Sequence, residues 1–221
     1  MVHLYKSKIL SYIEFRTGAI YHASGVLLAR VDNLQNTFLK TIGVSPENAL
    51  TEFNLSPLST RRDMALLGVI QRAIIGEVPV HFRTFFKRAA CTGHRDRTRH
   101  SMQLATHRRG KFLDVLADSI LGLVDVYNLL PERIVQENTV KGFQSALQEM
   151  VKAAMHANKP GWESLYSPRH ALHSHQLKEW FHWKPEAVTT LGAMDGDSAS
   201  TAANCITGWL QFGSAKYMNN D

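Results

Sequence analysis

The sequence predicts an all-α fold, and three observations support this prediction. Apolar residues recur at intervals of three and four in four segments, which is the spacing of one helix face. Glycine or proline follows each segment at the point where a helix would end. No segment shows the sustained alternation of apolar and polar residues that a half-buried strand requires.

The first apolar stripe begins near the start of the chain and is interrupted near two glycines. Gly43 and Pro46 end it. Because such a stripe exists chiefly to be buried, we expect its members to lie in the core. They are Ile9, Leu10 and Ile13, and, after Gly18 and Gly25, Leu27, Val31, Leu34, Phe38 and Ile42.

The second predicted helix follows the stretch from Asn54 to Pro57. It begins at Thr60, whose hydroxyl would cap the helix together with Asp63, three residues later. Gly76 and Pro79 end it. Its apolar face comprises Leu66, Leu67, Ile70 and Ile74. We expect the first two stripes to pack as an antiparallel helical pair.

Two further helices are predicted in the second half of the chain. The third passes Gly122, which lowers helix propensity, and stops before Pro131. The fourth ends at the breaker sequence Asn158-Lys159-Pro160-Gly161. The third face comprises Leu113, Leu116, Ile120 and Leu123, and the fourth comprises Val140, Phe143, Leu147, Met150 and Val151.

The basic residues are concentrated in one window of the sequence. Between Arg83 and Lys111 there are nine lysines and arginines and one acid, Asp96, so this window carries a charge of +8 within a net charge of +6. The remainder has 16 basic and 18 acidic residues, or −2. Clustered cations suit a polyanionic partner because they release counterions from phosphates, whereas the alternative is a solvated loop that only keeps the chain soluble.

Four regions follow from this pattern: helices over 1–88, a basic connector over 89–111, a helical segment over 112–185 and a tail over 186–221. The stretch 192–204 holds almost no large apolar residue, so we expect the tail to be disordered. The start of the chain lacks a signal peptide, and no run of about 18 apolar residues exists. We therefore expect an intracellular chain, in nucleus or cytoplasm, without contact with a membrane.

Possible metal ligands occur in two places, but their spacing does not favour a designed site. Cys91 and His94 are followed by His100 and His107, and these histidines are seven residues apart, too far for a second close ligand pair. A second group comprises His170, His173, His175 and His182 near Trp180, Phe181 and Trp183. Its aromatic rings would either stack on unpaired bases or pack against the helical core. We predict no metal site and no cofactor in this chain.

Two patches of sequence together resemble a known family over residues 8–170. The first comprises Ile9-Leu10, Ile13-Glu14-Phe15-Arg16-Thr17, Tyr21, Val31-Asp32, Leu34-Gln35, Phe38-Leu39, Asn54-Leu55, Pro57-Leu58, Arg61-Arg62 and Leu67-Gly68. The second comprises Gly122-Leu123-Val124, Tyr127-Asn128, Leu130-Pro131, Ile134-Val135, Val140, Phe143-Gln144 and Leu147. In this order they resemble the thumb and the carboxyl-terminal part of non-LTR (LINE-like) retrotransposon reverse transcriptases.

The resemblance implies a fragment of an RNA-directed DNA polymerase that lacks the fingers and the palm. Polymerases of this kind hold two Mg²⁺ ions between paired aspartates, whereas here no two acidic residues are adjacent. No catalytic residue is therefore carried over, and we expect no polymerase activity from this chain alone. In the intact parent, the resemblance implies that residues 8–88 grip the RNA/DNA template-primer duplex through backbone contacts.

The candidate nucleic-acid-binding residues are all cationic. For Arg61 and Arg62 the alternative is a role in surface solubility or pairing with Asp63 or Glu52. The candidates are Arg61, Arg62, Arg83, Lys87, Arg88, Arg95, Arg97, Arg99, Arg108, Arg109 and Lys111. Two other functions compete with this one: a helical protein-interaction module with the basic run as a tether, and a decayed reading frame without function.

Overall fold

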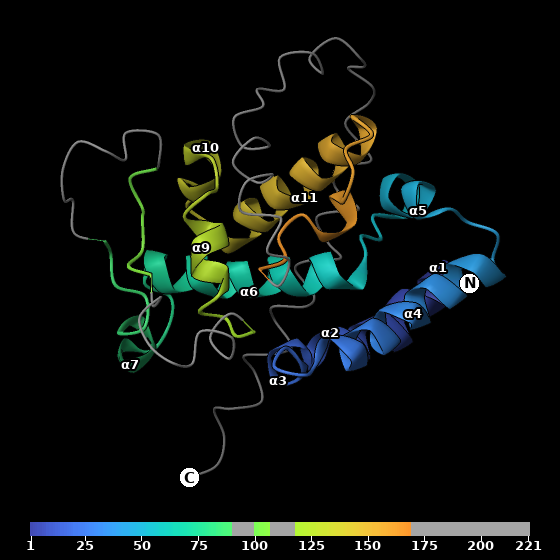
Figure 1. Cartoon of the computed structure of the whole chain (residues 1–221), viewed down its shortest axis with the longest axis horizontal. Coiled ribbons are helices and arrows are strands. Elements are labelled where there is room, and N and C mark those ends of the chain that lie inside the picture. The colour runs from blue at the N-terminus through green and yellow to red at the C-terminus, as the bar shows by residue number, and fades with distance from the viewer. Residues whose placement is uncertain (90–99, 107–117, 169–221) are drawn as a thin grey trace. The chain divides into compact units, whose positions relative to one another are not determined.

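The computed structural model of the chain describes residues 1–89, 100–106 and 118–168 (Figure 1). Its regular structure in these ranges is helical, and extended pairing there is limited to one isolated bridge between Arg88 and Leu104. The all-α prediction is thus confirmed for this part of the chain. None of the helices described there combines the length and the apolar character needed to cross a bilayer.

The described residues fall into two units, Met1–Thr17 and residues 18–168. In the first unit, α1 (Val2–Leu4), a π-helical stretch (Tyr5–Leu10) and α2 (Ser11–Phe15) follow one another directly. The guanidinium of Arg16 lies 4.8 Å from the centre of the Tyr12 ring, a cation–π contact within the unit. The short helix α3 (Thr17–Ile20) lies at the sequence boundary of the two units.

The second unit opens with two helices, where the sequence had suggested one. Helix α4 (Gly25–Thr41) ends before Gly43, whose φ of 70° is left-handed. Helix α5 (Pro46–Phe53) was not predicted. The Ser45 hydroxyl caps α5 by accepting a bond from the Asn48 amide at 3.2 Å, and Pro46 fits the first helical position.

The central element of the second unit is helix α6 (Leu58–Ile75), which begins before the predicted start. The predicted cap was wrong, because Pro57 precedes the helix and Thr60 and Asp63 lie inside its first turns. There the Thr60 hydroxyl donates to the carbonyl oxygen of Glu163, and Asp63 accepts a 2.9 Å bond from the Tyr21 hydroxyl. These side chains therefore bind tertiary partners instead of the helix end.

Helix α6 packs against elements from both halves of the chain. It contacts α4, which runs in the opposite direction, as predicted (Figure 1). It also contacts α7 (Val80–Arg83), α9 (Leu123–Tyr127), α11 (Val140–His156) and the 3₁₀ turn Trp162–Ser164. Helix α10 (Glu132–Val135) packs on α11. Eleven α6 residues are buried, more than one amphipathic face would require, because neighbours cover it on several sides.

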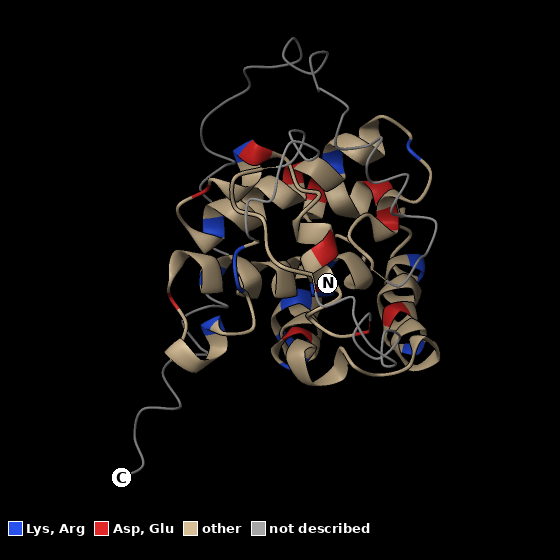
Figure 2. Ribbon diagram, turned by 60° about the vertical axis from the view of Figure 1, so that its left-hand side comes forward, with Lys and Arg blue, Asp and Glu red and all other residues tan. Residues whose placement is uncertain are grey.

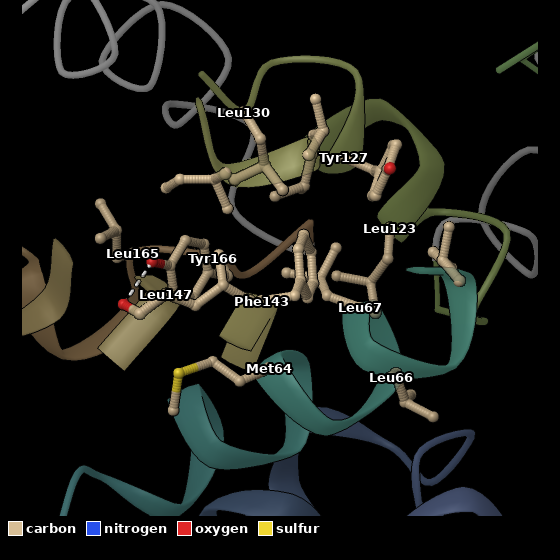
Figure 3. Packing of buried hydrophobic residues seen from close by; sticks show 14 of the residues in the cluster. Met64, Leu66, Leu67, Leu123, Tyr127, Leu130, Phe143, Leu147, Leu165 and Tyr166 are labelled. Carbon is tan, nitrogen blue, oxygen red and sulfur yellow. Dashed lines mark hydrogen bonds between the residues drawn. The ribbon is translucent and has the colours of Figure 1, made fainter. Parts of the chain in front are cut away.

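One hydrophobic cluster runs through the second unit (Figure 3). Leu67 of α6 and Leu123 of α9 lie in this cluster beside Phe143 and Leu147 of α11. The cluster also contains Tyr166, which follows the 3₁₀ turn. The Tyr166 hydroxyl donates a 2.8 Å bond to the Leu147 carbonyl, and burial raises its pKa. Since the cluster joins residues before 88 to residues after 112, the expected regions do not have separate cores.

The buried face of α4 differs from the predicted stripe. Leu27 and Leu34 are 52% and 54% exposed, whereas Leu28, Gln35 and Leu39 are buried. Gln35 is tolerated there because its amide nitrogen donates a 2.9 Å bond to the Ser56 carbonyl. A stripe defined by apolar residues alone passes over this glutamine, and so it identifies a neighbouring face of the helix.

The faces predicted for the other helices agree better with the structure. On α6, Ile74 is partly buried and the remaining predicted residues are buried. On α11, Met150 is partly buried, and Val140, Phe143, Leu147 and Val151 are buried. The third predicted helix does end before Pro131, because α9 stops at Tyr127 and α10 starts directly after this proline. Its predicted course was wrong at Ile120, which lies in a turn before α9. Leu113 and Leu116 lie outside the described residues, as does the tail predicted over 186–221.

Candidate nucleic-acid interface

A short segment after α6 carries three of the candidate cations on a fixed backbone. Gly76 ends α6 with a φ of 90°, and its carbonyl oxygen accepts a bond from the guanidinium of Arg83 in α7. The Phe86 amide then donates a 3.0 Å bond to the Arg83 carbonyl, so the turn after α7 is closed. Arg83, Lys87 and Arg88 are exposed on this segment.

The segment is fixed to a second stretch of chain by the isolated bridge. The Ala89 amide donates to the Gln103 carbonyl and the Ala105 amide donates to the Lys87 carbonyl, both at 2.9 Å. Lys87 and Arg88 thus belong to a paired backbone while their side chains remain exposed. An exposed cation on a paired backbone needs less ordering when it meets a phosphate.

Residues 100–106, which the sequence assigned to a connector, are anchored on the core. The Asn128 side chain accepts a bond from the Leu104 amide and donates one to the Leu104 carbonyl, both at 2.8 Å. Leu104 itself is 2% exposed. The middle of the basic connector is therefore part of the folded unit, held by an amide that pairs with the backbone as a neighbouring strand would.

His100 is a second anchor of residues 100–106 and is unsuited to act as a zinc ligand. Its Nδ1 accepts a 3.1 Å bond from the Met102 amide, so Nε2 carries the proton and donates to the Tyr127 carbonyl at 2.9 Å. With both ring nitrogens engaged, His100 has no lone pair to offer to a metal. Cys91, His94 and His107 lie outside the described residues.

Ser101 and Glu132 form the third anchor. The backbone amide of Ser101 donates to Glu132 Oε2 at 2.8 Å, and its hydroxyl donates to Oε1 at 2.6 Å. These bonds, the hydroxyl bond first, lower the pKa of the Glu132 carboxyl. The carboxylate therefore fixes the start of residues 100–106 and is ionised at neutral pH.

Tyr127 connects the anchors to α6. Burial raises the pKa of its hydroxyl, against the opposing effect of the nearby Arg88 charge. The hydroxyl donates a 2.6 Å bond to Gln71 Oε1, and the Gln71 nitrogen donates to the carbonyls of Val135 and Glu137 at 3.2 and 2.9 Å. This buried glutamine therefore ties α6 to α9 and to the end of α10.

Arg62 is unavailable for phosphate contact. It is 5% exposed, and its two terminal nitrogens bind the Asp32 carboxylate at 2.5 and 2.9 Å. Its partner is Asp32 of α4, not Asp63 or Glu52, the partners considered from the sequence. Arg61 is half-buried and donates to the Asn54 carbonyl at 3.4 Å. We therefore leave Arg62 out of the proposed interface.

Distance along α6 also separates Arg61 from the other described candidates. Arg61 lies in the first turn, whereas Arg83 binds the carbonyl of Gly76 at the opposite end. Fifteen residues of helix span about 22 Å. The structure thus brings Arg83, Lys87 and Arg88 into one segment and leaves Arg61 outside it. The remaining candidates, Arg95, Arg97, Arg99, Arg108, Arg109 and Lys111, lie outside the described residues.

Sequence reasoning missed the aromatic residues within this basic segment. Phe82 and Phe86 pack with their ring centres 5.6 Å apart, and Phe86 is buried in the core. Phe85 is 51% exposed between Arg83 and Lys87. The sequence signal was the pattern of Phe82, Phe85 and Phe86 at the start of the basic run, where Phe85 stands between Arg83 and Lys87.

Charge on the described surface is otherwise mixed. Lysines and arginines are spread over several helices with acidic residues among them (Figure 2). No group of three or more possible metal ligands occurs in residues 1–89, 100–106 and 118–168. The histidine and tryptophan group at 170–183 lies outside these ranges. In comparisons with known proteins, no family model, curated protein or solved structure matches the chain.

Proposed function

We propose that this chain is part of a retroelement RNA-directed DNA polymerase and binds the RNA/DNA template-primer duplex without taking part in nucleotide transfer. The proposal rests on the order of the motif residues in the sequence and on the basic segment formed by Arg83, Lys87 and Arg88. The Mg²⁺ ions of such polymerases need paired acids, and no two acids are adjacent in this sequence. The proposal therefore assigns nucleotide transfer to the palm of the parent polymerase.

The single observation that carries the proposal is the exposure of Lys87 and Arg88 on a bridged backbone. Both residues lie at the start of a window with a charge of +8, and the bridge to Leu104 joins the two flanks of residues 90–99. Cations held in this way neutralise phosphates and release their counterions. Such contacts read no base sequence, as a duplex grip that sets processivity requires.

The proposal is tested by reversing two charges in the segment. We compare the full chain with a Lys87→Glu/Arg88→Glu variant for binding to an RNA/DNA hybrid over a range of salt concentrations. If Arg83, Lys87 and Arg88 each neutralise one phosphate, log affinity of the unaltered chain should fall with log salt at a slope of about −3. The variant should bind more weakly, with a slope reduced by about two.

A matched control uses two cations outside the segment. Arg30 and Lys40 are exposed on α4, so Arg30→Glu/Lys40→Glu makes the same change in net charge. The control should retain the affinity and the slope of the unaltered chain. Binding that is insensitive to salt, or equal losses in both double variants, would contradict the proposal.

One observation favours a second function, docking of a protein partner. Val26, Leu27 and Leu34 of α4 are 69%, 52% and 54% exposed, and an exposed apolar surface often marks an interface. The two functions are separated by an Arg95→Glu/Arg97→Glu/Arg99→Glu variant and a Leu27→Gln/Leu34→Gln variant. Weaker hybrid binding by the first alone supports nucleic-acid binding, whereas unchanged hybrid binding by both favours the protein-interaction module.

A further inference from the structure

Phe85 is a large aromatic side chain that the fold does not bury. It is 51% exposed, and Val80 of the same segment is 76% exposed. Its ring meets Phe82 edge to face, with ring centres 6.1 Å apart and an angle of 63° between the planes. Packing of the segment on the core is supplied by Phe86, which is 7% exposed.

The residues close to Phe85 in the sequence include three cations. Arg83 precedes it, Lys87 and Arg88 follow it, and all three are exposed. Apolar surface rimmed by charge is a mark of a binding site. Exposed cations on the segment that carries this ring favour an anionic partner, and the combination of ring and cations favours one whose flat aromatic groups alternate with negative charges along a chain.

We propose that Phe85 is a stacking platform for an unpaired base of single-stranded nucleic acid, with the flanking phosphates held by Arg83, Lys87 and Arg88. This inference rests on the proposed function and specifies the form of the ligand. In a duplex the faces of the bases are covered by their neighbours, so only a single-stranded portion of the ligand offers a base to the ring. Stacking of this kind is tolerant of sequence because every base has a π face.

The backbone around Phe85 is fixed before any ligand binds. The Phe85 amide donates a 3.3 Å bond to the Phe82 carbonyl, and the Phe86 amide donates a 3.0 Å bond to the Arg83 carbonyl. The bridge at Arg88 holds the segment on its other side. Because the ring is attached to an ordered turn, little conformational entropy is lost when a base stacks on it.

The test compares two substitutions that differ in their aromatic face but not in charge. Phe85→Leu keeps an apolar side chain and removes the π face, whereas Phe85→Trp retains one. The full chain and both variants are titrated with a twelve-nucleotide oligo(dT), an abasic strand of equal length, and a blunt RNA/DNA hybrid. Phe85→Leu should weaken oligo(dT) binding roughly 5- to 100-fold, with hybrid binding and salt dependence unchanged. Phe85→Trp should bind oligo(dT) at least as tightly as the unaltered chain.

The outcomes separate this inference from the proposed function. Equal binding of oligo(dT) and the abasic strand by the unaltered chain would overturn the stacking platform, as would equal effects of Phe85→Leu on oligo(dT) and on the hybrid. After either result, the proposed binding of the RNA/DNA hybrid is still supported if Lys87→Glu/Arg88→Glu weakens hybrid binding. If that double variant binds the hybrid normally, the proposed function fails regardless of Phe85.

Discussion

At the N-terminal end of α6, Arg62 is buried and both of its terminal nitrogens bind the carboxylate of Asp32. Beyond the C-terminal end of the same helix, Lys87 and Arg88 are exposed, and neither makes an ion pair within the described residues. The two regions use cationic side chains for opposite purposes. One joins α6 to α4 inside the fold, and the other presents charge to the solvent.

The difference comes from what surrounds each cation. Arg62 lies next to other buried polar links, since Asp63 binds the Tyr21 hydroxyl and Thr60 binds the Glu163 carbonyl. Desolvation of a guanidinium is costly unless a carboxylate pairs with it, and α4 supplies Asp32 for this purpose. Lys87 and Arg88 are exposed, and within the described residues only their backbone is paired, so their charge is available to a ligand.

The largest expected effect comes from removing the buried cation, Arg62. Arg62→Ala leaves the Asp32 carboxylate without its partner in a site where the Arg62 and Asp32 side chains are 6% and 26% exposed. We expect the free energy of unfolding to fall by about 3 kcal/mol, the lower end of the range for buried pairs because Asp32 is partly hydrated. Urea unfolding followed by circular dichroism measures this loss.

Arg88→Ala is the matched control for this measurement. An exposed arginine without an ion pair should change the free energy of unfolding by no more than about 0.5 kcal/mol. Conversely, Arg88→Ala should weaken hybrid binding through loss of one phosphate contact, with a salt slope reduced by about one. Equal destabilisation by the two substitutions would remove the distinction between the two regions.

A smaller effect is expected from loosening the anchors of the basic segment. Asn128→Ala removes both bonds to Leu104 and leaves a buried backbone amide and carbonyl without these partners. We expect a loss of about 2 kcal/mol in the free energy of unfolding. Hydrogen exchange at the amides of Ala89 and Ala105 should also become faster, because the bridge depends on the position of residues 100–106.

Asn138→Ala is the control, since this asparagine is exposed. It should leave both stability and exchange unchanged. If Asn128→Ala destabilises the protein but leaves exchange at Ala89 and Ala105 slow, the bridge is maintained without this anchor. In that case the basic segment would be ordered by its own turn after α7.

The parts of the fold that the sequence predicted are those determined by local chemistry. Gly43 and Gly76 adopt left-handed φ values where helix ends were predicted. The face of α11 follows from apolar spacing because Phe143, Leu147 and Val151 all point into one core. Helix α5 was missed because it is short, and its cap at Ser45 lies within a stretch that had been assigned to a break.

The parts that could not be predicted depend on partners distant in sequence. Gln35 is buried because Ser56 accepts its bond, and Thr60 is inside a helix because Glu163 accepts its bond. Among the candidate site residues, Lys87 is exposed, whereas Arg62 was chosen by residue type without knowledge of Asp32 and is buried. The sequence gives the number of cations in a region, and tertiary contacts decide which of them face solvent.

The smallest expected effect concerns the pH dependence of the bond between the Glu132 carboxylate and the Ser101 amide. The Glu132 pKa is below its ordinary value of 4.5, chiefly because of the Ser101 hydroxyl bond. A carboxyl with a lowered folded-state pKa contributes stability above its unfolded value, and this contribution is lost as the pH falls below 4.5 through the lowered pKa. We expect hydrogen exchange at the Ser101 amide, corrected for its intrinsic pH dependence, to become less protected over this range.

Glu132→Gln tests whether the carboxylate is the cause. The glutamine retains a similar shape but does not titrate at acidic pH, so protection of the Ser101 amide should be lower at neutral pH and nearly independent of pH below 4.5. The buried side offers the internal reference, because the Gln35 bond to Ser56 contains no titratable group. If the Ser101 amide and the Gln35 side-chain amide lost protection in the same pH range, the whole unit would be unfolding. That result would refute the local role of Glu132.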